Sequence, residues 1–133
     1  MIESLHLIAT IYMCGLIWFV QLVHYPMFAH VGPNHFREYE AIHNRLTSIA
    51  VMPAMLIELG TAILLAIQNP SPLYIIGVIL VGLIWLSTFT LSVPCHTRLL
   101  KGFDAKTHRK LVTTNWFRTL GWSIRAGLFA FAI

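Results

Sequence analysis

Four long apolar runs, separated by short polar stretches, dominate this sequence of 133 residues. They cover about residues 5–23, 46–67, 73–93 and 111–133. Each is close to the roughly 20 residues that a helix needs to cross a bilayer core. The sequence therefore predicts an all-α fold in which a single domain, residues 1–133, forms a four-transmembrane-helix bundle.

The scarcity of charge agrees with a surface that faces lipid. Charged residues make up 11% of the chain and hydrophobic residues 57%, whereas a typical soluble domain is about a quarter charged. The nine Lys and Arg residues outnumber the five Asp and Glu residues. They lie in two loops and in the last apolar run, which is not the pattern of a nucleic-acid-binding face. We therefore expect membrane lipid, and no nucleic acid, as a partner.

The basic residues also predict an orientation. The loop after the first run holds Arg37 and Arg45, and the loop after the third holds five more, whereas the turn at residues 68–72 and both termini hold none. The five are Arg98, Lys101, Lys106, Arg109 and Lys110. Because basic loops stay in the cytoplasm, we expect a bacterial inner-membrane protein with both termini outside. The inverted orientation is the alternative.

Each run carries one narrow polar stripe at helical spacing. The stripes consist of Thr10, Cys14, Gln21 and His24; Glu40, His43, Thr47, Glu58 and Thr61; Trp85, Thr88, Ser92 and His96; and His108, Asn115, Arg118, Trp122 and Arg125. Exposed polar groups in lipid cost several kcal/mol. We therefore expect the four stripes to face one another inside the bundle.

The charged residues of these stripes are candidates for ligand binding. The helical rise puts Glu58 about 18 Å and Arg125 about 21 Å above the cytoplasmic starts of their helices, so they should pair. Arg118 and Asn115 lie nearer the cytoplasm, where Arg118 is expected to receive an anionic group through its planar fork of donors. Gln21 is the fifth candidate ligand-binding residue, beside Glu58, Asn115, Arg118 and Arg125. The alternative is a structural polar latch between the second and fourth helices.

A second set suggests a transition metal. Glu40 and His43 have the i, i+3 spacing by which bundle helices hold carboxylate-bridged metals. His24 and His96 end the first and third runs at the same face of the membrane. Imidazole together with carboxylate suits iron, manganese, zinc or copper. The alternative is that these side chains only form hydrogen bonds with water, headgroups or loop backbone.

Two resemblances to known families concern different parts of the chain. The first rests on Leu5-His6-Leu7-Ile8-Ala9, Phe36, Glu40, Leu46 and Pro53-Ala54-Met55. This half resembles the membrane-bound, haem-associated bacterial protoporphyrinogen oxidases and their copper-resistance relatives, which implies haem as a cofactor with His6 as its ligand. The second rests on length, layout and the Asn115-x-x-Arg118 spacing, which resemble the small four-span proteins of the anthrone-oxygenase-like group.

Three functions are compatible with these features. The favoured one is a membrane oxidoreductase or cofactor-binding protein, in which Asn115, Arg118 and Arg125 orient an apolar substrate with an anionic or carbonyl group. The second is a binding or transport module for an amphipathic anion, which would act as a homo-oligomer because four helices make a poor solitary transporter. The third is a non-catalytic subunit of a larger membrane complex.

Overall fold

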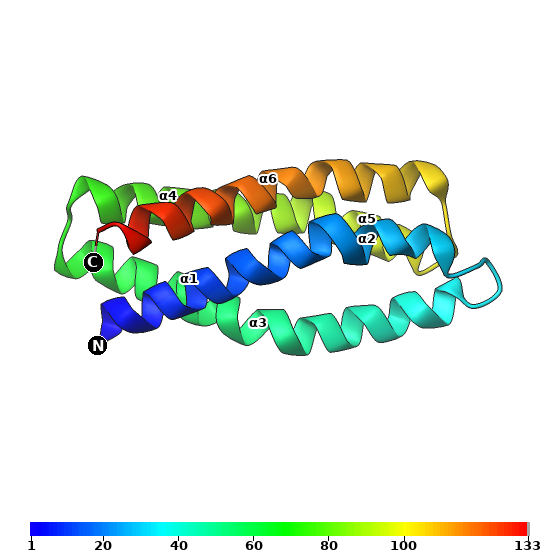
Figure 1. Ribbon diagram of the computed structural model, residues 1–133, viewed down its shortest axis with the longest axis horizontal. Coiled ribbons are helices and arrows are strands. Elements are labelled where there is room, and N and C mark those ends of the chain that lie inside the picture. The colour runs from blue at the N-terminus through cyan, green and yellow to red at the C-terminus, as the bar shows by residue number, and fades with distance from the viewer. Residues whose placement is uncertain (133) are drawn as a thin grey trace.

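The chain passes four times along one long axis in a computed structural model that describes residues 1–132 (Figure 1). The first pass comprises α1 (Ile2–Phe19), the π-helix η1 (Val20–His24), α2 (Tyr25–Met27) and the short 3-10 helix η2 (Phe28–His30). The second is α3 (Phe36–Gln68). The third comprises α4 (Pro72–Ser87), the π-helix η3 (Thr88–Ser92) and α5 (Val93–Leu99), and the fourth is α6 (Ala105–Ala130). The described residues contain no strand, which confirms the predicted all-α class.

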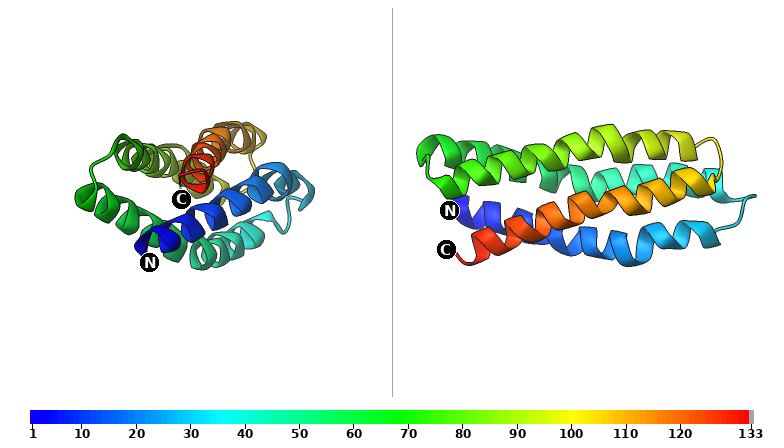
Figure 2. Two further views of the ribbon diagram at one scale, coloured as in Figure 1. Left: turned by 60° about the vertical axis from the view of Figure 1, so that its left-hand side comes forward. Right: turned by 90° about the horizontal axis from the view of Figure 1, so that it is seen from above.

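The four passes surround a common core. Helix α1 packs against α3 and α6, and α4 packs against the same two helices, so α1 and α4 lie at opposite corners (Figure 2). The core between them includes Met13 and Ile17 of α1, Met55 of α3, Ile84 of α4 and Trp122 of α6. Both termini lie at one end of the bundle, and the two longer loops lie at the other (Figure 1).

Three of the four passes are long and apolar enough to cross a membrane, namely Ile2–His30, Phe36–Gln68 and Pro72–Leu99. The second begins at Phe36, ahead of the predicted apolar run at residues 46–67, and continues unbroken through Pro53. Helix α6 is also long, but Asn115, Arg118 and Arg125 lower its mean hydropathy.

Apolar side chains cover the outside of the bundle as well as its core, and many polar side chains are buried beside that core. Large apolar residues such as Ile8, Ile49 and Phe117 are exposed along the outside of the bundle. The buried polar and charged residues are His6, Thr10, Gln21, Glu40, His43, Glu58, Thr61, Ser92, Thr107, Asn115, Arg118, Thr119 and Arg125. The prediction that the polar stripes turn inward is confirmed for the buried stripe residues, which are Thr10, Gln21, Glu40, His43, Glu58, Thr61, Ser92, Asn115, Arg118, Trp122 and Arg125. The other stripe residues are half-buried.

Two π-helical turns interrupt the first and third passes. In each, a proline follows at the second residue after the turn, Pro26 after η1 and Pro94 after η3. Proline lacks an N–H and clashes with the carbonyl four residues earlier, so a wider turn just before it relieves the clash. The turns rotate the residues that follow, Tyr25 and His96 among them. Single π-turns within helices are frequent at functional sites.

Candidate functional site

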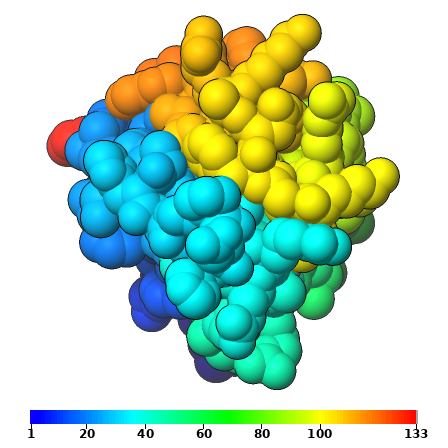
Figure 3. Space-filling model, turned by 90° about the vertical axis from the view of Figure 1, so that its right-hand side faces the viewer, coloured from blue at the N-terminus to red at the C-terminus, as the bar shows by residue number. Residues whose placement is uncertain are grey.

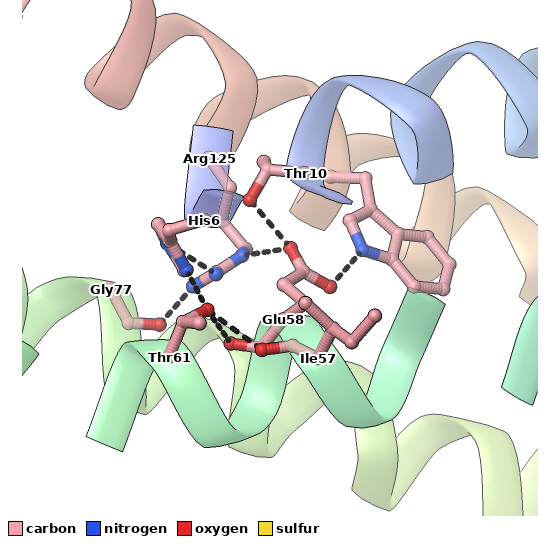
Figure 4. Close-up of polar contacts among 8 residues, drawn as sticks. His6, Thr10, Ile57, Glu58, Thr61, Gly77 and Arg125 are labelled. Atoms are coloured by element: carbon pink, nitrogen blue, oxygen red, sulfur yellow. Dashed lines mark hydrogen bonds and ion pairs between the residues drawn. The ribbon is translucent and has the colours of Figure 1, made fainter. Parts of the chain in front are cut away.

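The polar interior is organised in three layers, and the layer nearest the termini centres on Glu58 (Figure 4). Arg125 Nε donates to Glu58 Oε1 at 2.9 Å, and the Thr10 hydroxyl donates to the same oxygen at 3.0 Å. Trp122 Nε1 donates to the other carboxylate oxygen at 2.8 Å. Both charged side chains are 0% exposed. The predicted pairing of Glu58 with Arg125 is confirmed.

The remaining donors of Arg125 are also used. Its Nη1 donates to the backbone carbonyl of Gly77, and its Nη2 lies 3.3 Å from His6 Nε2. The other ring nitrogen of His6, Nδ1, lies 2.8 Å from the Thr61 hydroxyl. This layer therefore joins α1, α3, α4 and α6 through a hydrogen-bonded ion pair, and it acts as the structural latch that the sequence suggested as an alternative.

The same contacts bear on haem binding at His6. Both ring nitrogens of His6 are engaged with protein groups, its edge packs on the Phe129 ring, and the residue is 1% exposed. An imidazole needs a free ring nitrogen to ligate iron. The residues around His6 therefore do not fit the haem that the resemblance implied.

The middle layer joins α6 to the first pass through amides. Asn115 Nδ2 and the Thr119 hydroxyl both donate to Gln21 Oε1, at 2.9 and 3.1 Å. Gln21 Nε2 donates to the Val112 carbonyl at 3.0 Å. Gln21 and Asn115, both predicted as ligand-binding residues, thus contact each other and position the next residue of the layer, Arg118.

Arg118 differs sharply from Arg125. It is 6% exposed, and its Nη1 makes two long hydrogen bonds, 3.3 Å to Asn115 Oδ1 and 3.4 Å to Ser92 Oγ. Its Nε has no hydrogen-bond partner, and no carboxylate among residues 1–132 lies within ion-pair distance of it. The guanidinium lies 5.3 Å from the centre of the Trp122 ring. Arg118 is therefore a buried cation without a counter-ion.

The third layer, nearest the basic loops, contains the histidines. His24 Nε2 lies 2.8 Å from His43 Nδ1, which is also 3.1 Å from the Thr47 hydroxyl. His96 Nε2 lies 3.0 Å from the Tyr25 hydroxyl, and its Nδ1 lies 2.5 Å from Glu40 Oε1. His24, Glu40, His43 and His96, which the sequence predicted to lie close together, therefore form one cluster.

These four residues meet as hydrogen-bond partners. Both nitrogens of His96 are engaged, and the His24–His43 contact occupies one nitrogen of each ring. No group of three or more His, Cys, Asp or Glu side chains in the described part of the chain is arranged to hold a metal ion. The four side chains form hydrogen bonds with one another and with Tyr25 and Thr47, and not the contacts with water, headgroups or loop backbone that were the alternative to a metal site.

A cavity of about 290 Å³ connects the middle and third layers. It lies between α3 and the segment that runs from the end of α4 into α5. Arg118 lines it, and so does Trp85, whose buried Nε1 has no hydrogen-bond partner in residues 1–132. Tyr25, His43 and His96 line it as well. The cavity lining therefore includes two side chains that each have a buried donor nitrogen without a partner among the described residues, Arg118 Nε and Trp85 Nε1. It also includes three side chains that can transfer protons.

The rest of the cavity is mainly apolar, and it opens on the long side of the bundle. Val51 and Met55 are buried in its wall, whereas Ser48, Phe89 and Val93 are exposed at its edge. The sequence placed Trp85, His43, His96 and Arg118 on inward stripes but missed Tyr25. The sequence feature that could have pointed to Tyr25 is Pro26, because the π-turn associated with this proline directly precedes Tyr25.

No known protein family, curated protein or solved structure matches this chain.

Proposed function

We propose that this protein is an integral membrane protein of the bacterial inner membrane and that all four passes cross the bilayer. The three long apolar passes support this. In α6, the polar residues Asn115, Arg118 and Arg125 are buried, as charged residues in membrane helices almost always are. The exposed charged residues of α6 lie in its first turns, at Lys106, Arg109 and Lys110. After Thr113 the exposed residues of α6 are apolar, namely Trp116, Phe117, Leu120, Ile124 and Ala130.

The proposed orientation places both basic loops in the cytoplasm and both termini outside. The two loops lie side by side at one end of the bundle, where Figure 3 shows residues 30–45 in cyan next to residues 95–110 in yellow. The turn that contains Ser71 lies at the other end with the termini (Figure 1). The positive-inside rule supports this orientation, because the seven basic residues of the first and second long loops lie at one end.

Cysteine labelling tests the orientation. In a background in which Cys14 and Cys95 are replaced by Ala, Ser71→Cys should react with a membrane-impermeant maleimide added to intact cells. The matched control, Lys101→Cys in the exposed basic loop, should react only after the cells are opened. The reverse pattern would show that the bundle is inverted.

We further propose that the cavity beside Arg118 binds an amphipathic weak acid. The observation that carries this proposal is the absence of a counter-ion for Arg118 among the described residues. An unpaired buried charge costs several kcal/mol, and an anion from outside the chain would remove that penalty. The guanidinium favours a carboxylate, because its donors match the two oxygens. The Trp85 N–H supplies another donor.

The shape of the cavity indicates the rest of the ligand. The apolar wall suits an alkyl chain or ring, and the open side between α3 and the α4–α5 segment faces the direction of the lipid in the proposed orientation. A molecule whose head group lies at Arg118 can therefore leave its tail in the bilayer. Ligand binding is the part of the expected function that this cavity supports directly. The oxidoreductase, transport and complex-subunit interpretations stay predictions.

Calorimetric titration of dodecanoate into the protein in lipid nanodiscs tests the binding function. We expect Arg118→Gln to weaken binding at least about 30-fold, because truncating one partner of a buried charge pair costs about 2–5 kcal/mol. The matched control, Arg109→Gln on the exposed surface, should leave binding unchanged. Dodecanol, which has no carboxylate, should bind wild type no better than it binds Arg118→Gln. Equal dodecanoate binding by wild type and Arg118→Gln would refute the proposal.

A further inference from the structure

A chain of three hydrogen-bonded side chains ends in the cavity that Arg118 lines. The Tyr25 hydroxyl lies 3.0 Å from His96 Nε2, and His96 Nδ1 lies 2.5 Å from Glu40 Oε1. A carboxylate only accepts hydrogen bonds, so Nδ1 carries the proton of the neutral imidazole and donates it to Glu40. Nε2 is then an acceptor, and the Tyr25 hydroxyl donates to it. The chain thus presents a phenol that is polarised by an imidazole and a buried carboxylate.

The charged and titratable groups around His96 determine whether its imidazole can carry a second proton. Glu40 and His43 face it from α3, where the His43 ring stacks at 5.1 Å between centroids, and Tyr25 faces it from α2. Arg118 lines the same cavity from α6. Behind these groups, His24 contacts His43, and His108 contacts the Tyr25 carbonyl. Of these groups only Glu40 is acidic, so an imidazolium at His96 pairs with Glu40 while Arg118 opposes it.

The Glu40 carboxylate is buried and can pair with an imidazolium at His96. It is 0% exposed, and its second carboxylate oxygen, Oε2, has no partner among the described residues. A ligand carboxylate at Arg118 would neutralise the cation in the described lining of the cavity that opposes a charge on His96. Binding of the anion and protonation of His96 therefore stabilise each other.

From this geometry we propose that the Tyr25–His96–Glu40 chain takes up the acid proton of the bound ligand. This inference rests on the proposed binding function. The ligand arrives from the bilayer as the neutral acid, since a charged group in hydrocarbon is expensive, and it is held in the cavity as the carboxylate. The chain is thus a proton-exchange site that admits weak acids from lipid.

The transfer balances without any further reactant. The O–H bond of the ligand acid breaks, and its electron pair stays on the ligand oxygen. The Tyr25 oxygen accepts this proton while its own hydroxyl proton moves to His96 Nε2. The products are a ligand carboxylate beside Arg118 and a His96 imidazolium beside the Glu40 carboxylate. Among the ligand and the described residues, two ion pairs replace a neutral acid, the unpaired Arg118 cation and a Glu40 carboxylate that is bonded only to a neutral imidazole, and release of the ligand reverses the step.

Proton uptake measured with dodecanoate tests the proposal. Titrations in two buffers of different ionisation enthalpy, at a pH at which free dodecanoate is ionised, give the protons taken up per ligand after subtraction of empty nanodiscs. We expect wild type to take up one proton per dodecanoate. Tyr25→Phe and His96→Gln, which remove the hydroxyl and the basic ring, should each take up none and bind at least tenfold more weakly.

A matched variant and a spectroscopic measurement complete the test. His30→Gln, at an exposed histidine in η2, should keep the uptake of wild type. Infrared spectra of wild type with carboxyl-labelled dodecanoate need no variant to fold, and they should show a bound carboxylate band. Binding that depends on Arg118 but involves no proton uptake, or a bound carboxylic acid band, would overturn the proton-exchange site and leave the binding function standing. Absence of Arg118-dependent binding would overturn both.

Discussion

Glu58→Gln and Arg125→Gln are each expected to lower the free energy of unfolding by about 3–5 kcal/mol, because each leaves a buried charge without its partner. The two side chains are 0% exposed, and their contact is 2.9 Å. The double variant removes both charges at once. Its loss should therefore be clearly smaller than the sum of the two single losses, with a coupling energy in the upper part of the roughly 0.5–3 kcal/mol seen for residues in contact.

Denaturant unfolding in detergent micelles gives the four stabilities of this double-mutant cycle. An ion pair on the surface of the same protein serves as a control, since Arg98 Nε lies 3.6 Å from Asp104 Oδ2 and both side chains are exposed. The cycle of Arg98→Gln with Asp104→Asn should show little or no coupling, because water screens exposed pairs. Additive losses for Glu58→Gln and Arg125→Gln would contradict a latch between these two side chains.

Gly77→Ala is expected to destabilise the bundle by about 1–3 kcal/mol, the usual effect of an added methyl in a filled core. A Cβ at this position would lie 2.7 Å from Cζ of Phe129. That ring has little room to move, because it packs against His6 at 4.5 Å and under the Arg125 guanidinium at 5.5 Å. Moving α4 away instead would disturb the Gly77 carbonyl that accepts from Arg125.

Gly82→Ala, in the same helix, is the matched comparison. No atom lies within 4 Å of a Cβ built at Gly82. Removing a glycine from a helix interior stabilises it by roughly 0.5–1 kcal/mol. The two Ala variants should therefore shift the denaturation midpoint in opposite directions. A loss of stability in Gly82→Ala as large as that in Gly77→Ala would mean that helix α4, and not the contact with Phe129, responds to the change.

Features that depend on one helix at a time were predictable. Hydropathy marked the long apolar runs, because burial in lipid is a property of composition. The 100° turn per residue placed Glu58, His43 and Arg118 on inward faces before any partner was known. Equal depth was enough to pair Glu58 with Arg125, since the axial rise of a helix is constant.

Features that depend on how helices are rotated and spaced against one another were not predictable. Arg118 and Arg125 lie on the same face of α6, seven residues apart, yet only Arg125 meets a carboxylate. The backbone carbonyl of Gly77 has no sequence signature as an acceptor. The position of Tyr25 depends on the π-turn that precedes it. Apolar periodicity does not encode these details.

The sequence by itself therefore determined the all-α class, the inward polar stripes and the depth of each buried charge. Only the tertiary structure decided which of those charges are neutralised, and that His96 contacts Tyr25 and Glu40. The physical reason is the distance over which each effect acts. Hydropathy and helical period act along one helix, whereas a hydrogen bond or ion pair between helices exists only within about 3–4 Å. Small rotations of neighbouring helices decide whether side chains reach that distance.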